Sequence, residues 1–246
     1  MYRVLTAALL SVVAIGHALA ADLPPSPPLR APAIYVPAVA PVYNWGGFYV
    51  GINGGWGFAS GSPTYTVVGG PLSGLTGTGS GSLNGGLAGG QIGANWQIDA
   101  LVIGIEGDFD WSGQKRTDSF ACGAACTVSE TIKLPWIATI RGRFGYAIDR
   151  VLLYGTGGVA FTHASDNVTL TGTGTIFSAS STNVGWTIGA GGEVALAQNW
   201  TARIEYLYIG TNVKQSGALS LISGTVSETA NVHDSLIRAG VNFKFP

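Results

Sequence analysis

Residues 236–245 read Leu-Ile-Arg-Ala-Gly-Val-Asn-Phe-Lys-Phe, and this stretch decides the fold class. Successive side chains of an extended strand point to opposite faces, so Ile237 and Phe243 share one face. Arg238 and Lys244 lie on the other face. One side of the strand is therefore apolar and the other is charged.

Composition indicates which environment that apolar face meets. The 246 residues include 12 basic and 13 acidic side chains, for a net charge of -1, so no basic surface indicates nucleic-acid binding. Only 10% of residues are charged, against about 25% in ordinary soluble domains. Mean hydropathy is +0.33. After residue 20, however, no run approaches the roughly 18 apolar residues of a spanning helix. A closed membrane β-barrel reconciles these observations, because lipid tolerates only helices and closed hydrogen-bond ladders.

Eight segments repeat the alternation of the C-terminal stretch. We expect strands at residues 46–58, 86–96, 101–111, 134–147, 151–162, 185–196, 200–208 and 236–245. Tight turns are expected at residues 97–100, 148–150 and 197–199, and long loops at 59–85, 112–133, 163–184 and 209–232. Short periplasmic turns that alternate with longer outer loops are typical of outer-membrane barrels. The predicted fold class is all-β, an eight-stranded antiparallel up-and-down transmembrane β-barrel.

Every charged side chain within these segments falls on the predicted inner face. A charge on the lipid face near the midplane costs about 2–4 kcal/mol, so this segregation favours a membrane barrel. The predicted charge network of the lumen is Glu106, Asp108, Asp110, Arg141, Arg143, Glu193, Arg203, Glu205, Arg238 and Lys244. Neighbouring strands suggest pairing of Glu106 and Asp108 with Arg141 and Arg143, of Glu193 with Arg203, and of Glu205 with Arg238.

Outward aromatic side chains gather at both ends of the predicted strands, as in the two interfacial girdles of a membrane barrel. The girdle residues are Trp56, Trp96, Trp111, Trp136, Trp186, Trp200, Tyr208, Phe243 and Phe245. The soluble alternative is a lipocalin-like barrel, which also has eight strands. That fold would place the apolar stripe inside and leave about ten strand charges to cover a large solvated surface. The membrane barrel is the better interpretation.

The N-terminal region carries the marks of export. Residues 1–20 combine Arg3, an apolar core and the small-residue site Ala18-Leu19-Ala20, which predicts a cleaved signal peptide. Residues 21–44 hold seven of the 11 prolines, and such a segment cannot join a ladder. We interpret it as a Pro-rich periplasmic spacer before a barrel at residues 45–246.

Several of these features resemble one known family. They are the signal peptide, the Ala-Asp-Leu-Pro start, the spacer, the motif Trp-Gly-Gly-Phe-Tyr-Val-Gly at residues 45–51 and the ending at 238–245. The chain is similar to the small porin-like outer-membrane proteins of alphaproteobacteria, called outer membrane immunogenic or opacity-like proteins. The resemblance implies an OmpA-type barrel in the bacterial outer membrane, in contact with outer-membrane lipid and lipopolysaccharide. It implies envelope structure or surface interaction better than transport.

The last strand also resembles the signal read by the barrel assembly machinery. That signal ends on an aromatic residue at the chain terminus, whereas Pro246 follows Phe245 here. The resemblance therefore implies the assembly machinery as a partner, and Pro246 bears on the efficiency of assembly. A surface ligand at the loops is a further candidate partner, although the sequence does not locate its site.

Two functions remain open for the lumen. Eight strands close a bore just wide enough for side chains to fill, so we expect the inner charges to plug it. The alternative is a small porin, in which the inward glycines leave room for water beside a charged lining. The plug is preferred because of the strand count.

An outer-membrane enzyme that modifies lipid A is the third hypothesis. It rests on two His-x-Ser pairs, His163 with Ser165 and His233 with Ser235, which period two places on one face. No third residue is identifiable to orient either pair, so the sequence favours rim polar residues and no enzyme. Neither a catalytic residue nor a cofactor site is expected. Cys122 and Cys126 are candidates for a loop disulfide, since two thiols without a nearby histidine make only half a metal site.

Overall fold

The computed structural model describes residues 43–71, 73–123, 126–172, 174–219 and 224–245. The predicted signal peptide, the spacer up to residue 42 and Pro246 lie outside the described residues. Among the described residues there is no helix long and apolar enough to cross a membrane.

The described residues form nine antiparallel strands. These are β1 (Gly47–Val68), β2 (Thr76–Thr78), β3 (Gly81–Ile98), β4 (Leu101–Gly123), β5 (Cys126–Ile148), β6 (Val151–Leu170), β7 (Gly174–Ala195), β8 (Trp200–Leu219) and β9 (Gly224–Lys244). The short β2 pairs only with β1, and the other eight follow one another around a single sheet. The prediction of eight antiparallel up-and-down strands is confirmed.

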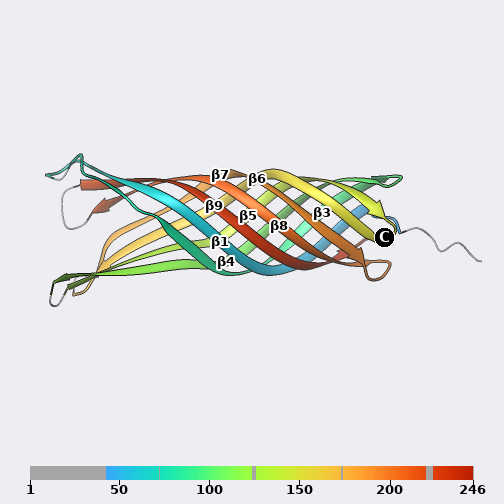
Figure 1. The fold of residues 1–246 in the computed structure, drawn as a ribbon, viewed down its shortest axis with the longest axis horizontal. Coiled ribbons are helices and arrows are strands. Elements are labelled where there is room, and N and C mark those ends of the chain that lie inside the picture. The colour runs from blue at the N-terminus through green and yellow to red at the C-terminus, as the bar shows by residue number, and fades with distance from the viewer. Residues whose placement is uncertain (1–42, 72, 124–125, 173, 220–223, 246) are drawn as a thin grey trace, which may run out of the picture. The chain divides into compact units, whose positions relative to one another are not determined.

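The sheet closes on itself through β1 and β9. Their register runs from Tyr49 opposite Lys244 to Val68 opposite Thr225, so the first and last long strands pair along most of their length. Figure 1 shows the strands crossing obliquely as they wrap around a common axis. The β7–β8 pairing runs only from Gly185 opposite Thr211 to Ala195 opposite Thr201, so the ring is closed from the turns up to this level and, among the described residues, the loop-side parts of β7 and β8 do not pair with each other. Within the closed part, backbone donors and acceptors are satisfied in the sheet, as lipid requires.

Short turns join the strands at the end shown on the right-hand side of Figure 1: residues 99–100 between β3 and β4, 149–150 between β5 and β6, and 196–199 between β7 and β8. Asp99 and Asp149 have positive φ angles of 53° and 50° and start the β3–β4 and β5–β6 turns. Aspartate tolerates this left-handed conformation better than most residues do. The expected positions of these tight turns are correct.

The expected long loops are mostly strand. Residues 59–68, 112–123, 163–170 and 209–219 continue β1, β4, β6 and β8. The prediction ended each strand where the alternation of apolar and charged residues ended, and that criterion was wrong. Beyond the lipid the outer face of the strands meets water, so it no longer needs to be apolar, and Thr- and Ser-rich segments with good β-propensity can extend the ladder.

The apolar surface lies on the outside of the barrel. Ile52, Ile92 and Ile105 are 72%, 65% and 51% exposed, whereas the neighbouring inward residues Gln91 and Glu106 are 3% and 1% exposed. This distribution inverts that of a soluble barrel, whose interior holds the apolar side chains. A band of this kind is stable where lipid covers it.

One irregularity interrupts the alternation of β5. The pairing of β5 with both β4 and β6 shifts between Lys133 and Trp136. Proline cannot donate to a ladder, and Pro135 lies at this shift, so it accounts for a bulge here. Leu134 is consequently buried at 3% exposure, and the exposed Lys133 faces outward.

Candidate functional site in the barrel lumen

A layer of charged side chains fills the middle of the barrel. Nine of the ten predicted residues belong to it, and each is at most 6% exposed. We call these nine the lumen network: Glu106, Asp108, Asp110, Glu193, Glu205, Arg141, Arg143, Arg203 and Arg238. They come from β4, β5, β7, β8 and β9. Strand alternation directs all of them inward, where ion pairs join side chains from several strands.

Arg141 is bonded to three carboxylates. Its Nη2 lies 2.5 Å from Glu106 Oε1 and 2.9 Å from Asp108 Oδ2, and its Nη1 lies 2.9 Å from Glu205 Oε1. Its Nε also donates to the hydroxyl of Thr139 at 2.9 Å. The planar fork of arginine donors suits such multiple contacts. Arg141 therefore ties β5 to β4 and, across the bore, to β8.

Arg238 makes a matching set of contacts from β9. Its Nη1 lies 2.8 Å from Asp108 Oδ1 and 2.5 Å from Asp110 Oδ2, while its Nη2 lies 2.6 Å from Glu205 Oε2. Asp108 and Glu205 are thus each shared by Arg141 and Arg238. The shared carboxylates connect strands on opposite sides of the barrel into one network.

Arg143 and Arg203 extend the network toward the turn end. Arg143 pairs with Glu193 at 2.7 Å, donates to Tyr49 Oη at 2.8 Å and lies over the Tyr154 ring, 3.9 Å from its centroid. Arg203 pairs with Glu106 at 2.5 Å. The expected pairing of Glu193 with Arg203 is wrong, even though the two are direct neighbours in the β7–β8 register. Both side chains reach partners across the bore instead.

Burial makes these contacts mutually dependent. Moving an isolated charge into a low-dielectric interior costs several kcal/mol, which only close pairing and hydrogen bonding offset. Five carboxylates meet four guanidinium groups here, and Tyr49, Thr139, Thr201 and Asn242 supply further hydrogen bonds. The arrangement holds the strands together and leaves the bore filled with side chains.

Lys244 is the exception among the predicted charges. Its Nζ donates to the backbone carbonyl of Asn44 and lies 4.6 Å from the centroid of the Tyr43 ring. The alternation of β9 correctly predicts the face on which Lys244 lies. Lys244 is at the turn end of β9, however, and is not at the level of the lumen network. Placing Lys244 in the lumen network was therefore an error.

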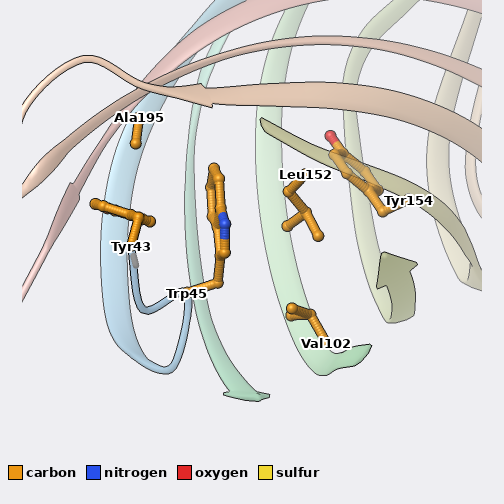
Figure 2. Close-up of a cluster of buried hydrophobic side chains, with 6 residues drawn as sticks. All are labelled: Tyr43, Trp45, Val102, Leu152, Tyr154 and Ala195. Atoms are coloured by element: carbon orange, nitrogen blue, oxygen red, sulfur yellow. The ribbon is translucent and has the colours of Figure 1, made fainter. Parts of the chain in front are cut away.

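A buried apolar layer closes the turn end of the lumen. It consists of Tyr43, Trp45, Val102, Leu152, Tyr154 and Ala195. Figure 2 shows the Trp45 ring between Tyr43 and Leu152. Trp45 is 2% exposed, its Nε1 donates to the Asp149 carbonyl at 3.1 Å, and its backbone N–H donates to Gln97 at 2.6 Å. The residues before β1 thus fold into the mouth of the barrel.

Sequence reasoning missed the role of Tyr43 and Trp45. The predicted spacer at residues 21–44 includes Tyr43, and the predicted barrel simply begins at Trp45. The sequence does contain a signal for this role. Tyr43 and Trp45 are separated from the inward-facing Tyr49 by an even number of residues, so period-two alternation places all three on the same face. Aromatic side chains on that alternation just before a first strand indicate a segment that folds into the bore.

Two more apolar layers lie on the loop side of the lumen network. The first consists of Leu87, Ile137, Ala160, Leu207, Ile209 and Leu236. The second consists of Ala59, Leu83, Leu134, Ala164, Val213 and Ala230. Ile137, Leu207 and Leu236 are fully buried at 0% exposure. Buried Gln114 donates to Asp234 at 2.9 Å in the same part of the bore. Apart from this pair, the layers separate the lumen network from the loop end with apolar side chains, through which hydrated ions pass only at high cost.

The predicted girdle residues lie on the outer wall. Trp96, Trp111 and Trp186 are 60%, 67% and 53% exposed. At the turn end Phe243 packs against Trp200 and Phe245, with ring centroids 5.2 Å and 5.4 Å apart. Aromatic rings of this kind prefer the boundary between hydrocarbon and water.

The two His-x-Ser pairs show no dyad geometry. His163 stacks on Trp136 with centroids 5.4 Å apart, and its Nδ1 contacts Thr182 at 3.0 Å. His233 stacks on Tyr208, and Ser235 contacts the Tyr206 hydroxyl at 3.1 Å. In this described part of the chain, neither histidine makes a hydrogen bond to the serine two residues away. Both rings act as interfacial aromatic groups on the outer wall.

The candidate disulfide falls at the β4–β5 hairpin. Cys122 belongs to β4 and Cys126 begins β5, but their side chains lie outside the described part of the structure. Among the described residues, no cluster of three or more His, Cys, Asp or Glu side chains is arranged to hold a metal ion.

Similarity to known proteins agrees with this geometry. The family model of the outer membrane protein β-barrel domain matches residues 6–245. The chain is 35% identical over 243 residues to the 31 kDa outer-membrane immunogenic protein of Brucella melitensis, covering 93% of both chains. It is 31% identical over 214 residues to the 22 kDa outer membrane protein of Rhizobium leguminosarum, covering 84% of this chain and 81% of the relative.

Solved structures of other outer-membrane proteins align with this chain at low sequence identity. OprG of Pseudomonas aeruginosa aligns with 14% identity and a TM-score of 0.49, over 81% of this chain and 97% of OprG. Neisserial surface protein A aligns with 16% identity and a TM-score of 0.40, over 80% and 97% of the two chains. The family match and the relatives place the protein in the outer membrane. This chain belongs to the outer membrane protein β-barrel family.

Proposed function

We propose that this protein is a closed barrel that serves the envelope through its structure and its surface contacts, without a channel or an enzymatic activity. The observation that carries this proposal is the filled lumen. The lumen network and three apolar layers occupy successive levels of the bore. An eight-stranded barrel is narrow enough for side chains alone to close it.

Its partners follow from its location. Lipid and lipopolysaccharide cover the exposed apolar band, and the barrel assembly machinery receives the chain through β9. The relatives named outer-membrane immunogenic proteins support a role at the cell surface. A surface ligand would meet the strand ends beyond the outer girdle.

Conductance of the refolded mature protein in a planar lipid bilayer tests the closed lumen. We expect no discrete current steps from protein shown to be folded by its heat-shifted gel mobility. Arg141→Ala should stay silent as well, because the two apolar layers on the loop side do not depend on this side chain.

The small porin is the competing function, and the same experiment separates the two. Reproducible steps whose amplitude changes in Arg141→Ala would show that ions pass through the lumen network. Arg116→Ala is the matched control, because Arg116 pairs with Asp118 at 2.6 Å beyond the apolar layers and both side chains are about one-third exposed. If both substitutions changed the amplitude of the current steps equally, the change in conductance would arise outside the lumen network.

A lipid-modifying enzyme is disfavoured by the contacts of the two histidines. Their rings stack on Trp136 and Tyr208, and hydrogen bonds that would activate a serine are lacking in this described region. Incubation of the folded protein with lipopolysaccharide should leave its acyl chains unchanged by mass spectrometry. Loss of an acyl chain that His163→Ala or His233→Ala abolishes would establish the enzyme instead.

A further inference from the structure

Four polar side chains form a row across the outer wall, from β3 to β6. The registers place Asn84 opposite Lys115, Lys115 opposite Lys133, and Lys133 opposite Ser165. Asn84, Lys115 and Lys133 are exposed, and Ser165 is half-buried. The row carries two positive charges and no negative charge.

The β5 bulge is what brings Lys133 into this row. Trp136 is directed outward, so uninterrupted alternation would direct Leu134 outward and Lys133 into the bore. The shift at Pro135 reverses both, which buries Leu134 in an apolar layer and exposes Lys133. Bulges are structural devices that re-aim side chains, often next to functional sites. Here the bulge places Lys133 opposite Lys115 on the outer wall.

Two like charges directly opposite each other on neighbouring strands destabilise a sheet. The Cβ atoms of such a pair are about 4.5–5.5 Å apart. Among the described residues, neither Lys115 nor Lys133 has an ion pair, whereas Arg116 next in sequence pairs with Asp118. Lys115 and Lys133 are therefore a pair of uncompensated cations that an external anion would stabilise.

The level of the row on the barrel indicates where that anion comes from. Trp111 and Trp136 are opposite each other on β4 and β5 immediately before the register shift, and they belong to the loop-side girdle. Such rings mark the boundary of the hydrocarbon. Lys115 follows Trp111 by four residues and Lys133 precedes Trp136 by three, so the lysine pair lies on the loop side of this boundary, where lipid headgroups are expected. The short turns define the periplasmic side, so these headgroups belong to the outer leaflet.

We propose that Lys115 and Lys133, flanked by Asn84 and Ser165, bind a phosphate group of the outer-leaflet lipid, lipopolysaccharide. The two ammonium groups supply charge, and the amide and hydroxyl can complete the hydrogen bonding of the phosphate oxygens. The acyl chains of the same lipid lie against the apolar band below, beside Trp111 and Trp136. The site deepens the lipid contact proposed above and does not depend on whether the lumen conducts.

Binding of purified lipopolysaccharide to the refolded protein in a zwitterionic detergent tests this site. The Lys115→Gln/Lys133→Gln protein should bind about tenfold or more weakly, since each lysine near an anionic surface contributes a several-fold gain in affinity. The matched control is Lys214→Gln, because Lys214 is also exposed but is opposite Thr229 rather than another lysine. The control should bind like the unchanged protein. Heat-shifted gel mobility establishes that each variant is folded.

Lipopolysaccharide stripped of its phosphate groups separates charge recognition from simple lipid adhesion. It should bind the unchanged protein and the double variant equally and weakly. Equal affinity of the two proteins for intact lipopolysaccharide would overturn the proposal, as would an equal loss in Lys214→Gln. Inorganic phosphate should compete only weakly; full displacement at the concentration of the lipid would assign the pair to a free anion and overturn the lipid site.

Discussion

The same eight strands run through two environments, and their side chains follow different rules in each. Between the girdles the outer face is apolar, and the inner face carries the buried lumen network. Beyond the outer girdle, in what we call the extension, cross-strand contacts are short and polar, such as Thr117 with Thr131 at 3.2 Å and Ser119 with Ser129 at 2.9 Å. Lipid imposes a strict segregation of side chains, whereas water on the outer face of the extension allows polar side chains there.

The largest expected difference concerns the ion pairs of the two regions. Arg238→Ala would leave Asp108, Asp110 and Glu205 short of a partner at full burial, which should lower the free energy of unfolding by about 3–5 kcal/mol. Arg116→Ala removes a partly exposed pair in the extension and should cost at most about 1 kcal/mol. Urea titration of both proteins folded into lipid vesicles measures the difference. Similar losses would mean that the lumen network is solvated.

The outer wall should show the next largest contrast. Ile105 is 51% exposed in the middle of the apolar band, so Ile105→Lys should destabilise the folded barrel by about 2–4 kcal/mol in lipid. Thr117→Lys introduces the same charge on an exposed position of the extension, where surface changes stay within about 0.5 kcal/mol. The same vesicle titration compares them. Equal effects would place position 105 outside the hydrocarbon.

Asp166 gives the extension a pH dependence of its own. Its side chain is buried at 1% exposure, and neither carboxylate oxygen has a hydrogen-bond partner among the described residues. Burial, followed by repulsion from Glu130 and Glu228, raises the pKa of Asp166 to about 7, which the nearby backbone N–H of Asn167 offsets only in part. The folded state therefore holds this proton up to a higher pH than the unfolded state does.

Stability from Asp166 should thus be fully present below about pH 4 and be lost as pH rises through about 7. Amide hydrogen exchange in β6 and β7 of the extension, corrected for intrinsic rates, should be faster at pH 8 than at pH 5. Asp166→Asn should remove that difference, while Asp118→Asn should keep it because Asp118 is paired with Arg116. If exchange in the unchanged protein did not depend on pH, Asp166 would not be the source of the pH dependence.

The smallest expected effect tests how little the polar pairs of the extension contribute. Ser129→Ala removes one exposed cross-strand contact with Ser119 and should cost about 0.2–1 kcal/mol. Differential exchange of amides around the β4–β5 hairpin is sensitive enough to measure it. A loss comparable to that of Arg238→Ala would show that the hairpin is coupled to the lumen network.

Much of the lipid-spanning region could be predicted from sequence, because lipid makes a misplaced charge costly. Alternation gave the eight strands, the inward direction of Glu106 and Arg141, and the outward direction of Trp111. The same criterion failed in the extension, where residues 59–68 and 112–123 were expected to be loops. A Thr- and Ser-rich segment in water can be a loop or a strand, and only its pairing with a neighbouring strand decides between them.

The sequence by itself determined the barrel, its closure and the sign of the charge at each inner position between the girdles. The tertiary structure decided which charges meet: Glu193 is beside Arg203 in register but pairs with Arg143. It also decided that Trp45 fills the turn-end mouth and that Lys133 faces outward. Period-two alternation is a local property of each strand, whereas contacts across a bore depend on how strand tilt and bulges bring distant side chains to one level.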